Sequence, residues 1–121
     1  MSISGIDRVV YGVEDIAASK RFFLDWGLKL LREDGSGLDF ETLNGCEIFV
    51  RHMDDPNLPP QRIEAGPTLR QVIWSAADDD AIAHCRQVME KAPGFSQADG
   101  ELQCIDPIGL AIAVRKSRKR N

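Results

Sequence analysis

Apolar and polar residues follow two different periods along the first quarter of the chain. Residues 6–13 are mostly β-branched or aromatic, which predicts a buried strand. Asp15 then offers a short carboxylate for the start of a helix, with Glu14 beside it at the positive end of the helix dipole. Gly27 is suited to the helix C-terminus. Between them apolar side chains recur at helical spacing, at Ile16, Phe22, Phe23 and Trp26.

Three runs with the alternating period of strands follow this helix, at residues 28–33, 38–43 and 46–52. The first two runs are separated by the turn sequence Asp34-Gly35-Ser36-Gly37, and the last two by Asn44-Gly45. Asn-Gly favours a type I′ hairpin, in which both central residues take positive φ. The first half is therefore predicted as β-α-β-β-β.

The second half repeats this order. Residues 69–76, 95–98, 102–105 and 110–115 are predicted strands. The helix between the first two of them starts at an acidic triplet, ends at Pro93-Gly94 and has an apolar stripe of Ile82, Cys85 and Met89. The last strand follows Asp106-Pro107-Ile108-Gly109, which has the composition of a type I turn.

The two halves also resemble each other in sequence at an almost constant offset. The run that starts at Arg8 reappears at Gln71, and NGCEIFVRH reappears as IGLAIAVRK with Gly109 in the place of Gly45. Two matched pairs at nearly one offset indicate a duplicated unit. We therefore predict one α+β domain of two βαβββ modules, at residues 4–54 and 68–116, with a Pro-rich linker at 55–67 and a basic tail at 117–121.

Composition narrows the class of protein. With 121 residues and 43% hydrophobic content, the chain can bury one core. No apolar run approaches the roughly 18 residues of a membrane span, and the start has no secretory pattern, so we expect a cytoplasmic protein with no membrane partner. Cys46, Cys85 and Cys104 are odd in number and widely spaced, as expected for reduced thiols. The basic tail has no interleaved aromatic residues, so nucleic-acid binding is not favoured.

Two groups of residues could suggest a metal site. Asp78, Asp79 and Asp80 could bind a divalent cation, but no further ligand spacing accompanies them and helix capping explains them better. His52 and His84 each stand alone in their segments, and His84 lies on a helix. We therefore interpret both histidines as surface or rim residues.

The order of elements resembles the vicinal oxygen chelate superfamily, which includes glyoxalases, bleomycin resistance proteins and extradiol dioxygenases. IDRVVYGVEDIAASKRFF is similar to the family's first strand, acidic cap and helix, and DPIGLAIAV is similar to its last turn and strand. The resemblance extends from Ile6 to Arg115. It implies a half-open barrel of mixed sheet around a cup between the modules, and a homodimer.

The resemblance also implies four inward positions that hold a divalent metal in active members. In this sequence these positions are Arg8, Phe49, Gln71 and Ala113. An arginine does not lose its proton in a protein, and Phe and Ala have no donor atom. Gln71 could offer one neutral oxygen, which is too little for a transition-metal site. We therefore predict no metal and no other cofactor.

Because strand side chains alternate, these four positions define the face of the sheet that lines the cup. The opposite face, with Tyr11, Ile48, Val50, Trp74, Ile112 and Val114, is predicted to pack under the helices. Three arginines against a single carboxylate, Glu47, suit an organic anion. Alternatively, Arg8, Arg51 and Glu47 pair with one another or with a second subunit. The candidate ligand-binding residues are Arg8, Val10, Glu47, Phe49, Arg51, Gln71, Ile73, Ala113 and Arg115.

Three functions remain open at this point. The first is metal-independent binding of a small aromatic or anionic organic molecule in the cup. The second is a divalent-metal-dependent lyase or ring-cleaving dioxygenase. The third is a non-catalytic domain of a dioxygenase-like assembly. No catalytic residue is predicted.

Overall fold

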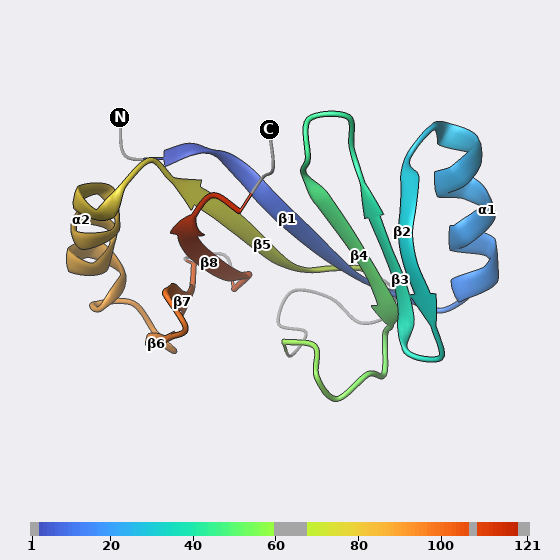
Figure 1. Cartoon of the computed structure of the whole chain (residues 1–121). Coiled ribbons are helices and arrows are strands. Elements are labelled where there is room, and N and C mark those ends of the chain that lie inside the picture. Colours follow the sequence, from blue (N-terminus) through green and yellow to red (C-terminus); the bar gives the residue numbers. More distant parts are fainter. Residues whose placement is uncertain (1–2, 60–67, 107–108, 119–121) are drawn as a thin grey trace.

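A computed structural model describes residues 3–59, 68–106 and 109–118 of the chain. The predicted order of elements is confirmed in both halves (Figure 1). Module one consists of β1 (Ile3–Val13), α1 (Ile16–Trp26), β2 (Lys29–Asp34), β3 (Gly37–Glu41) and β4 (Glu47–His52). Module two consists of β5 (Thr68–Ala76), α2 (Asp79–Met89), β6 (Ser96–Ala98), β7 (Glu101–Ile105) and β8 (Ala111–Lys116).

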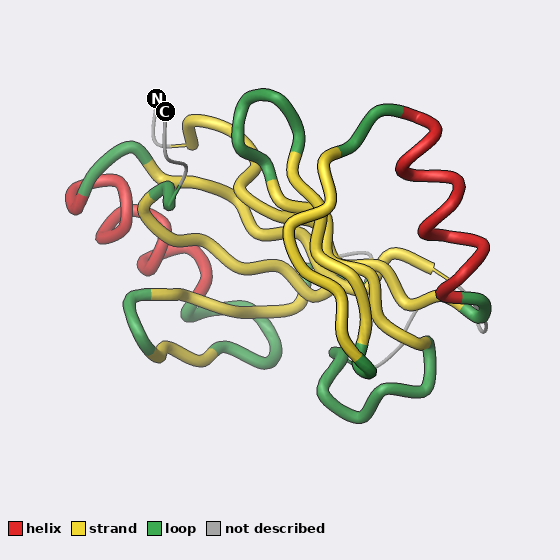
Figure 2. The backbone as a smooth tube through the Cα atoms, turned by 45° about the vertical axis from the view of Figure 1, so that its right-hand side comes forward, coloured by secondary structure: helices red, strands yellow, loops and turns green. Residues whose placement is uncertain are grey.

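All eight strands belong to one mixed sheet in the order β2-β3-β4-β1-β5-β8-β7-β6. The modules meet where β1 and β5 pair antiparallel, and within each module the first and last strands pair parallel. The sheet is open at its β2 and β6 edges, and the two helices lie at opposite ends of the molecule (Figures 1 and 2). This is the predicted half-open α+β architecture.

Strand register repeats from one module to the other. Arg8 pairs with Glu47 on β1 and β4, and Gln71 pairs with Ala111 on β5 and β8. The offset from Arg8 to Gln71 nearly equals the offset from Glu47 to Ala111, as in the sequence repeat. Between β3 and β4 the pair Leu38–Val50 likewise becomes Leu102–Val114 between β7 and β8. The backbone therefore carries the duplication across the whole sheet.

Both helices begin at the predicted caps. The Asp15 carboxylate accepts a hydrogen bond from the backbone N–H of Ala18, and Asp78 accepts one from Ala81, each at 2.9 Å. Gly27 ends α1 with φ of 114°, a left-handed conformation that glycine adopts without a steric penalty. Asp79 of the acidic triplet pairs with Lys116 at 3.2 Å.

One face of the sheet packs under the two helices, as the alternation of side chains predicts. Leu38, Phe40 and Val50 form the core beneath α1, with Ile48 packed against them. The core beneath α2 contains Leu102, Cys104 and Val114, with Trp74 and Ile112 packed against it. The other face of the sheet is therefore the one that lines the cup.

The hairpin between β3 and β4 differs from the prediction. Gly45 takes a positive φ of 88°, but Asn44 does not, so the turn is not type I′. The Gly45 N–H instead bonds to the Thr42 carbonyl, and the Thr42 N–H bonds to the Cys46 carbonyl. This is a type I turn followed by a left-handed glycine, the usual form of a three-residue loop. The three-residue loop shifts the strand pairing by one residue from that of a two-residue turn, so that Glu41 pairs with Glu47.

Parts of three predicted segments lie outside the described residues: 60–67 of the linker, 107 and 108 of the last turn, and 119–121 of the tail. Neither helix of the described ranges has the length and apolarity that a membrane crossing needs.

Candidate functional site

Five of the nine candidate residues line one pocket of about 220 Å³ on the cup face. We call it the module-one pocket. Its walls come from β1, β4 and β5, and residues from 55 to 59 lie against them. The candidates that line it are Arg8, Val10, Phe49, Arg51 and Gln71.

A second pocket of about 310 Å³ adjoins the first. We call it the module-two pocket. Gln71, Asn57, Leu58 and Pro59 line both pockets, so they form the wall between them. The remaining residues of the module-two pocket are uncharged, and they include Gln103, Ile105 and Ala111.

The segment from Met53 to Pro59 was predicted in part as linker, but it contributes to the site. Arg70 of β5, which is buried, donates to the carbonyl oxygens of Met53 at 2.6 Å and Pro59 at 3.0 Å. Between these two points, the N–H of Asn57 bonds to the Asp55 carboxylate, which tightens the turn. One guanidinium thus holds both ends of the segment that covers the cup.

Phe49 lies between two guanidinium groups in the module-one pocket. The Arg8 guanidinium carbon is 3.9 Å from the centre of the Phe49 ring and that of Arg51 is 4.9 Å away. Both distances are within the range of cation–π attraction. The pocket therefore presents an aromatic ring with a positive charge at two of its sides.

Both of these arginines also have acidic partners. Arg8 donates to Glu47 Oε1 from Nε at 2.8 Å and from Nη2 at 2.6 Å. Arg51 Nη1 lies 2.9 Å from Asp39 Oδ1, an ion-pair distance without hydrogen-bond geometry, and donates instead to the Leu38 and Val50 carbonyls. The pairing of Arg8 with Glu47 considered from the sequence is present, whereas Arg51 pairs with Asp39 rather than with Glu47.

Ile73, Ala113 and Arg115 share the cup face but do not line either cup pocket. Each is at most 2% exposed. The Arg115 guanidinium is held by Asp7 at 3.0 Å and by Glu101 at 3.5 Å, and its Nη2 lies 3.7 Å from Glu47 Oε1. The ion pairs of Arg115 therefore close the cup beside β8.

Asp7 is the most buried carboxylate of this network. Burial raises its pKa, but hydrogen bonds from the Arg118 backbone N–H, the Ser117 hydroxyl and the Arg115 guanidinium outweigh burial and hold the pKa below its ordinary value. Asp7 is therefore ionised at neutral pH although it is buried. Its contacts join β1 to the C-terminal end of β8 and the residues that follow it.

The prediction of a single carboxylate on the cup face was wrong, because Asp7, Asp39 and Glu101 also pair with its arginines. Asp7 was missed because a β-bulge interrupts the alternation between Ile6 and Arg8. Asp39 could have been found, since it alternates with the apolar pair Leu38 and Phe40 on β3.

The four inward positions do not fit a metal ion. Arg8, which is bonded to Glu47, lies against Phe49, while Ala113 is fully buried. Within the described ranges no three His, Cys, Asp or Glu side chains come together as possible ligands. His52 accepts a hydrogen bond from the Asp54 N–H through Nδ1, and His84 is part of α2, which covers the opposite face of the sheet. The side chains at these four positions therefore do not form a set of ligands for a transition metal.

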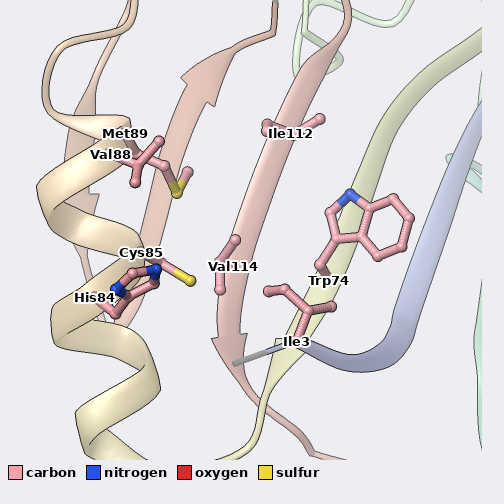
Figure 3. Close-up of a pocket in the computed structure, with 8 residues that line it drawn as sticks. All are labelled: Ile3, Trp74, His84, Cys85, Val88, Met89, Ile112 and Val114. Atoms are coloured by element: carbon pink, nitrogen blue, oxygen red, sulfur yellow. The ribbon is translucent and has the colours of Figure 1, made fainter. Parts of the chain in front are cut away.

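A third cavity lies between α2 and the sheet, away from the cup (Figure 3). Its volume is about 590 Å³ and its walls are mainly apolar. Trp74 and Ile112 line it from the sheet, and Cys85, Val88 and Met89 line it from the helix. We call it the α2 groove.

Comparison with known proteins places this geometry in a fold class. The open eight-stranded sheet with a helix on each module is the fold of the glyoxalase/bleomycin resistance protein/dioxygenase superfamily. No protein-family model matches the sequence, and no curated protein matches it.

Three solved structures are similar to this chain. The Mn(II)-bound glyoxalase from Novosphingobium aromaticivorans has a TM-score of 0.69 at 22% identity over 99% of this chain, which spans 42% of that chain. Methylmalonyl-CoA epimerase from Mycobacterium tuberculosis has a TM-score of 0.60 at 14% identity, over 95% of this chain and 89% of that one. A superfamily member from Vibrio splendidus 12B01 has a TM-score of 0.53 at 14% identity, over 93% of this chain and 97% of that one.

Proposed function

We propose that this protein binds a small aromatic or anionic organic molecule in the cup between its modules, without a metal ion. The observation that carries the proposal is the module-one pocket, in which Arg8 and Arg51 flank the ring of Phe49. A guanidinium matches the geometry of a carboxylate, and an aromatic ring stacks on another ring or on a guanidinium plane. An aromatic acid offers both groups.

The size and polarity of the cup support this ligand class. The module-one pocket has about 220 Å³, which exceeds the roughly 150 Å³ of a cavity that holds benzene. Polar groups at its wall, Gln71 and Asn57, can fix the orientation of a ligand. The adjoining module-two pocket leaves space for an uncharged substituent.

A ligand panel tests the proposal. Benzoate, phenylacetate and salicylate are titrated against the protein by calorimetry and by thermal shift, and at least one is expected to bind and raise the melting temperature. Phe49→Leu and Arg8→Gln are expected to weaken binding about tenfold each, through lost stacking and a lost charge-assisted bond. Arg21→Gln is the matched control, because Arg21 is exposed on α1, outside the pocket. Binding that is unchanged in both pocket variants contradicts the proposed site.

Metal independence is part of the proposal, and it rests on the donor atoms at the four inward positions. Arg8, Phe49 and Ala113 offer no ligand atom. Elemental analysis of the purified protein is expected to find no stoichiometric Fe, Mn, Zn or Ni. One metal ion per chain would favour the second function, a metal-dependent lyase or dioxygenase.

A third function, that of a non-catalytic unit in a larger assembly, has one specific observation in its favour. The chain spans 42% of the Novosphingobium glyoxalase, which therefore has room for another unit of this size. A homodimer of this chain would supply the same number of modules. Sedimentation velocity at micromolar concentration is expected to find the dimer, and failure of every acid in the panel to bind would favour the role as a unit of an assembly.

A further inference from the structure

Glu47 holds the cup-lining Arg8 through only one of its two carboxylate oxygens. Within the described part of the chain, every polar contact of the carboxylate uses Oε1: Arg8 Nε at 2.8 Å, Arg8 Nη2 at 2.6 Å and Arg115 Nη2 at 3.7 Å. The first two are charge-assisted hydrogen bonds, and the third is too long to be one. Glu47 is thus bonded to one guanidinium and lies close to a second.

These two guanidiniums have different surroundings. The Arg8 side chain is 21% exposed and lines the module-one pocket, whereas the Arg115 side chain is 2% exposed and lines neither cup pocket. Asp7 and Glu101 fix Arg115 from its Nε and Nη1 sides. Its Nη2 can therefore donate to Glu47 while the guanidinium itself stays in place.

We propose that Glu47 is an internal anion that competes with the ligand's carboxylate for Arg8, and that it moves to Arg115 when the ligand binds. This inference rests on the proposed function. The move shortens the 3.7 Å contact with Arg115 to a hydrogen bond of about 2.9 Å. It exposes the Nε and Nη2 edge of Arg8 to the pocket. Glu47 keeps a cationic partner throughout, so no buried charge is left unpaired.

This arrangement defines the class of ligand. Displacement of Glu47 frees one guanidinium edge, and the Nη1 of the other pocket arginine, Arg51, is bonded to two backbone carbonyls and lies beside Asp39. Asp39 already offsets the charge of Arg51, so Arg8 is the cation that displacement of Glu47 leaves for one carboxylate, with the ligand's ring against Phe49. A second negative group would lie near Glu47 and Asp39 without a cation of its own. The ligand class is an aromatic monocarboxylate.

Calorimetric titration of three probes tests the role of Glu47. Benzoate carries one carboxylate, phthalate two and benzamide none. In Glu47→Gln, which keeps the shape and removes the charge, benzoate affinity is expected to rise about tenfold, while benzamide affinity changes less than about threefold. The control is Glu33→Gln, which removes the same charge from an exposed carboxylate bonded to Lys20 on the other side of module one. It is expected to leave all affinities within about twofold, because solvent and salt screen its charge.

The outcomes separate this inference from the proposed function. If the wild-type protein binds benzoate and Glu47→Gln binds it equally or more weakly, the inference is overturned and the proposed function stands. If neither protein binds any probe, both are overturned. Benzoate binding by Glu47→Gln alone supports the inference, and wild-type phthalate affinity at or above that of benzoate contradicts it.

A structure of the wild-type protein with benzoate provides a measurement that needs no variant. We expect the ligand's carboxylate on Arg8 and Glu47 within hydrogen-bond distance of Arg115. A carboxylate bound elsewhere, with Glu47 still on Arg8, refutes the displacement even if Glu47→Gln does not fold.

Discussion

The two modules share a backbone but fill it with different side chains. The offset of the sequence repeat aligns Phe22 and Trp26 of α1, which are 60% and 70% exposed, with Cys85 and Met89 of α2, which are buried. In the sheet beneath them, Phe40 of β3 corresponds by register to Cys104 of β7. Under α1 the rings of Phe23 and Phe40 fill the space between helix and sheet, with their centroids 5.5 Å apart. Under α2 the smaller side chains leave the α2 groove.

The cup side shows the same divergence. The register that pairs Arg8 with Glu47 in module one pairs Gln71 with Ala111 in module two. The charged pair therefore belongs to one module, although both offer the same two backbone positions. A duplicated sheet can thus keep its hydrogen-bond ladder while one pair of equivalent positions is charged in module one and uncharged in module two.

The largest effect is expected from the two matched core positions. Phe40→Ala removes a fully buried ring from module one and is expected to cost about 4 kcal/mol of unfolding free energy. Cys104→Ala removes one sulfur atom at the equivalent position and is expected to cost about 1 kcal/mol. Urea unfolding followed by the fluorescence of Trp26 and Trp74, one in each module, measures both. Equal costs would break the comparison.

The ion pair that joins the modules is expected to give the next largest effect. Asp7→Asn leaves Arg115 with its weaker partners and is expected to cost about 3 kcal/mol at pH 7. Asp54→Asn, at a carboxylate that is 80% exposed, is the control and is expected to cost less than about 0.5 kcal/mol.

The cost of Asp7→Asn should depend on pH. Because the folded pKa of Asp7 is lowered, its contribution is complete above its unfolded pKa of about 3.9 and is lost as the pH falls through the folded value. Wild type and variant should therefore converge in stability in strong acid. A difference that persists there would show that the substituted amide disturbs packing rather than charge.

A smaller effect is expected in the reactivity of the three thiols. Burial raises the pKa of Cys85 and of Cys104, both in module two, so less of their reactive thiolate is present near pH 8. Cys46 in module one is partly exposed. We expect iodoacetamide to modify Cys46 about tenfold faster than the other two, as followed by peptide mass spectrometry. Earlier modification of Cys85 would indicate that the α2 groove opens.

The smallest effect is expected from metal ions. Among the four inward positions Gln71 offers one neutral oxygen and the other three offer no ligand atom, so EDTA or added Mn²⁺ should shift the melting temperature by less than about 1 °C. A clear increase with Mn²⁺ that is absent in Gln71→Leu would assign the ion to the cup.

The sequence alone predicts the fold well because its signals are local. Asp15 and Gly27 mark the ends of α1, and the constant offset of the repeat predicts the second module from the first. The faces of β4, β5 and β8 follow from alternation. The type I′ prediction at Asn44-Gly45 was wrong, because a three-residue loop can use the same two residues.

The site is less predictable because its contacts join distant segments. Asp7 bonds to Ser117 across 110 positions, and a bulge hides its direction from the alternation. Arg70 reaches back to Met53, a contact that no sequence period reports. The equivalence of Phe40 and Cys104, by contrast, follows from the offset of the repeat and could have predicted less side-chain volume under α2.

The two hydrogen bonds from Arg70 to Met53 and Pro59 have a consequence for the rate of ligand exchange. Because one side chain bonds to both ends of the covering segment, the segment leaves the cup completely only when both hydrogen bonds are broken. Exchange of the proposed ligand should then be slow for so small a pocket, with a residence time set by the opening step. In Arg70→Gln the dissociation rate should rise more than the association rate.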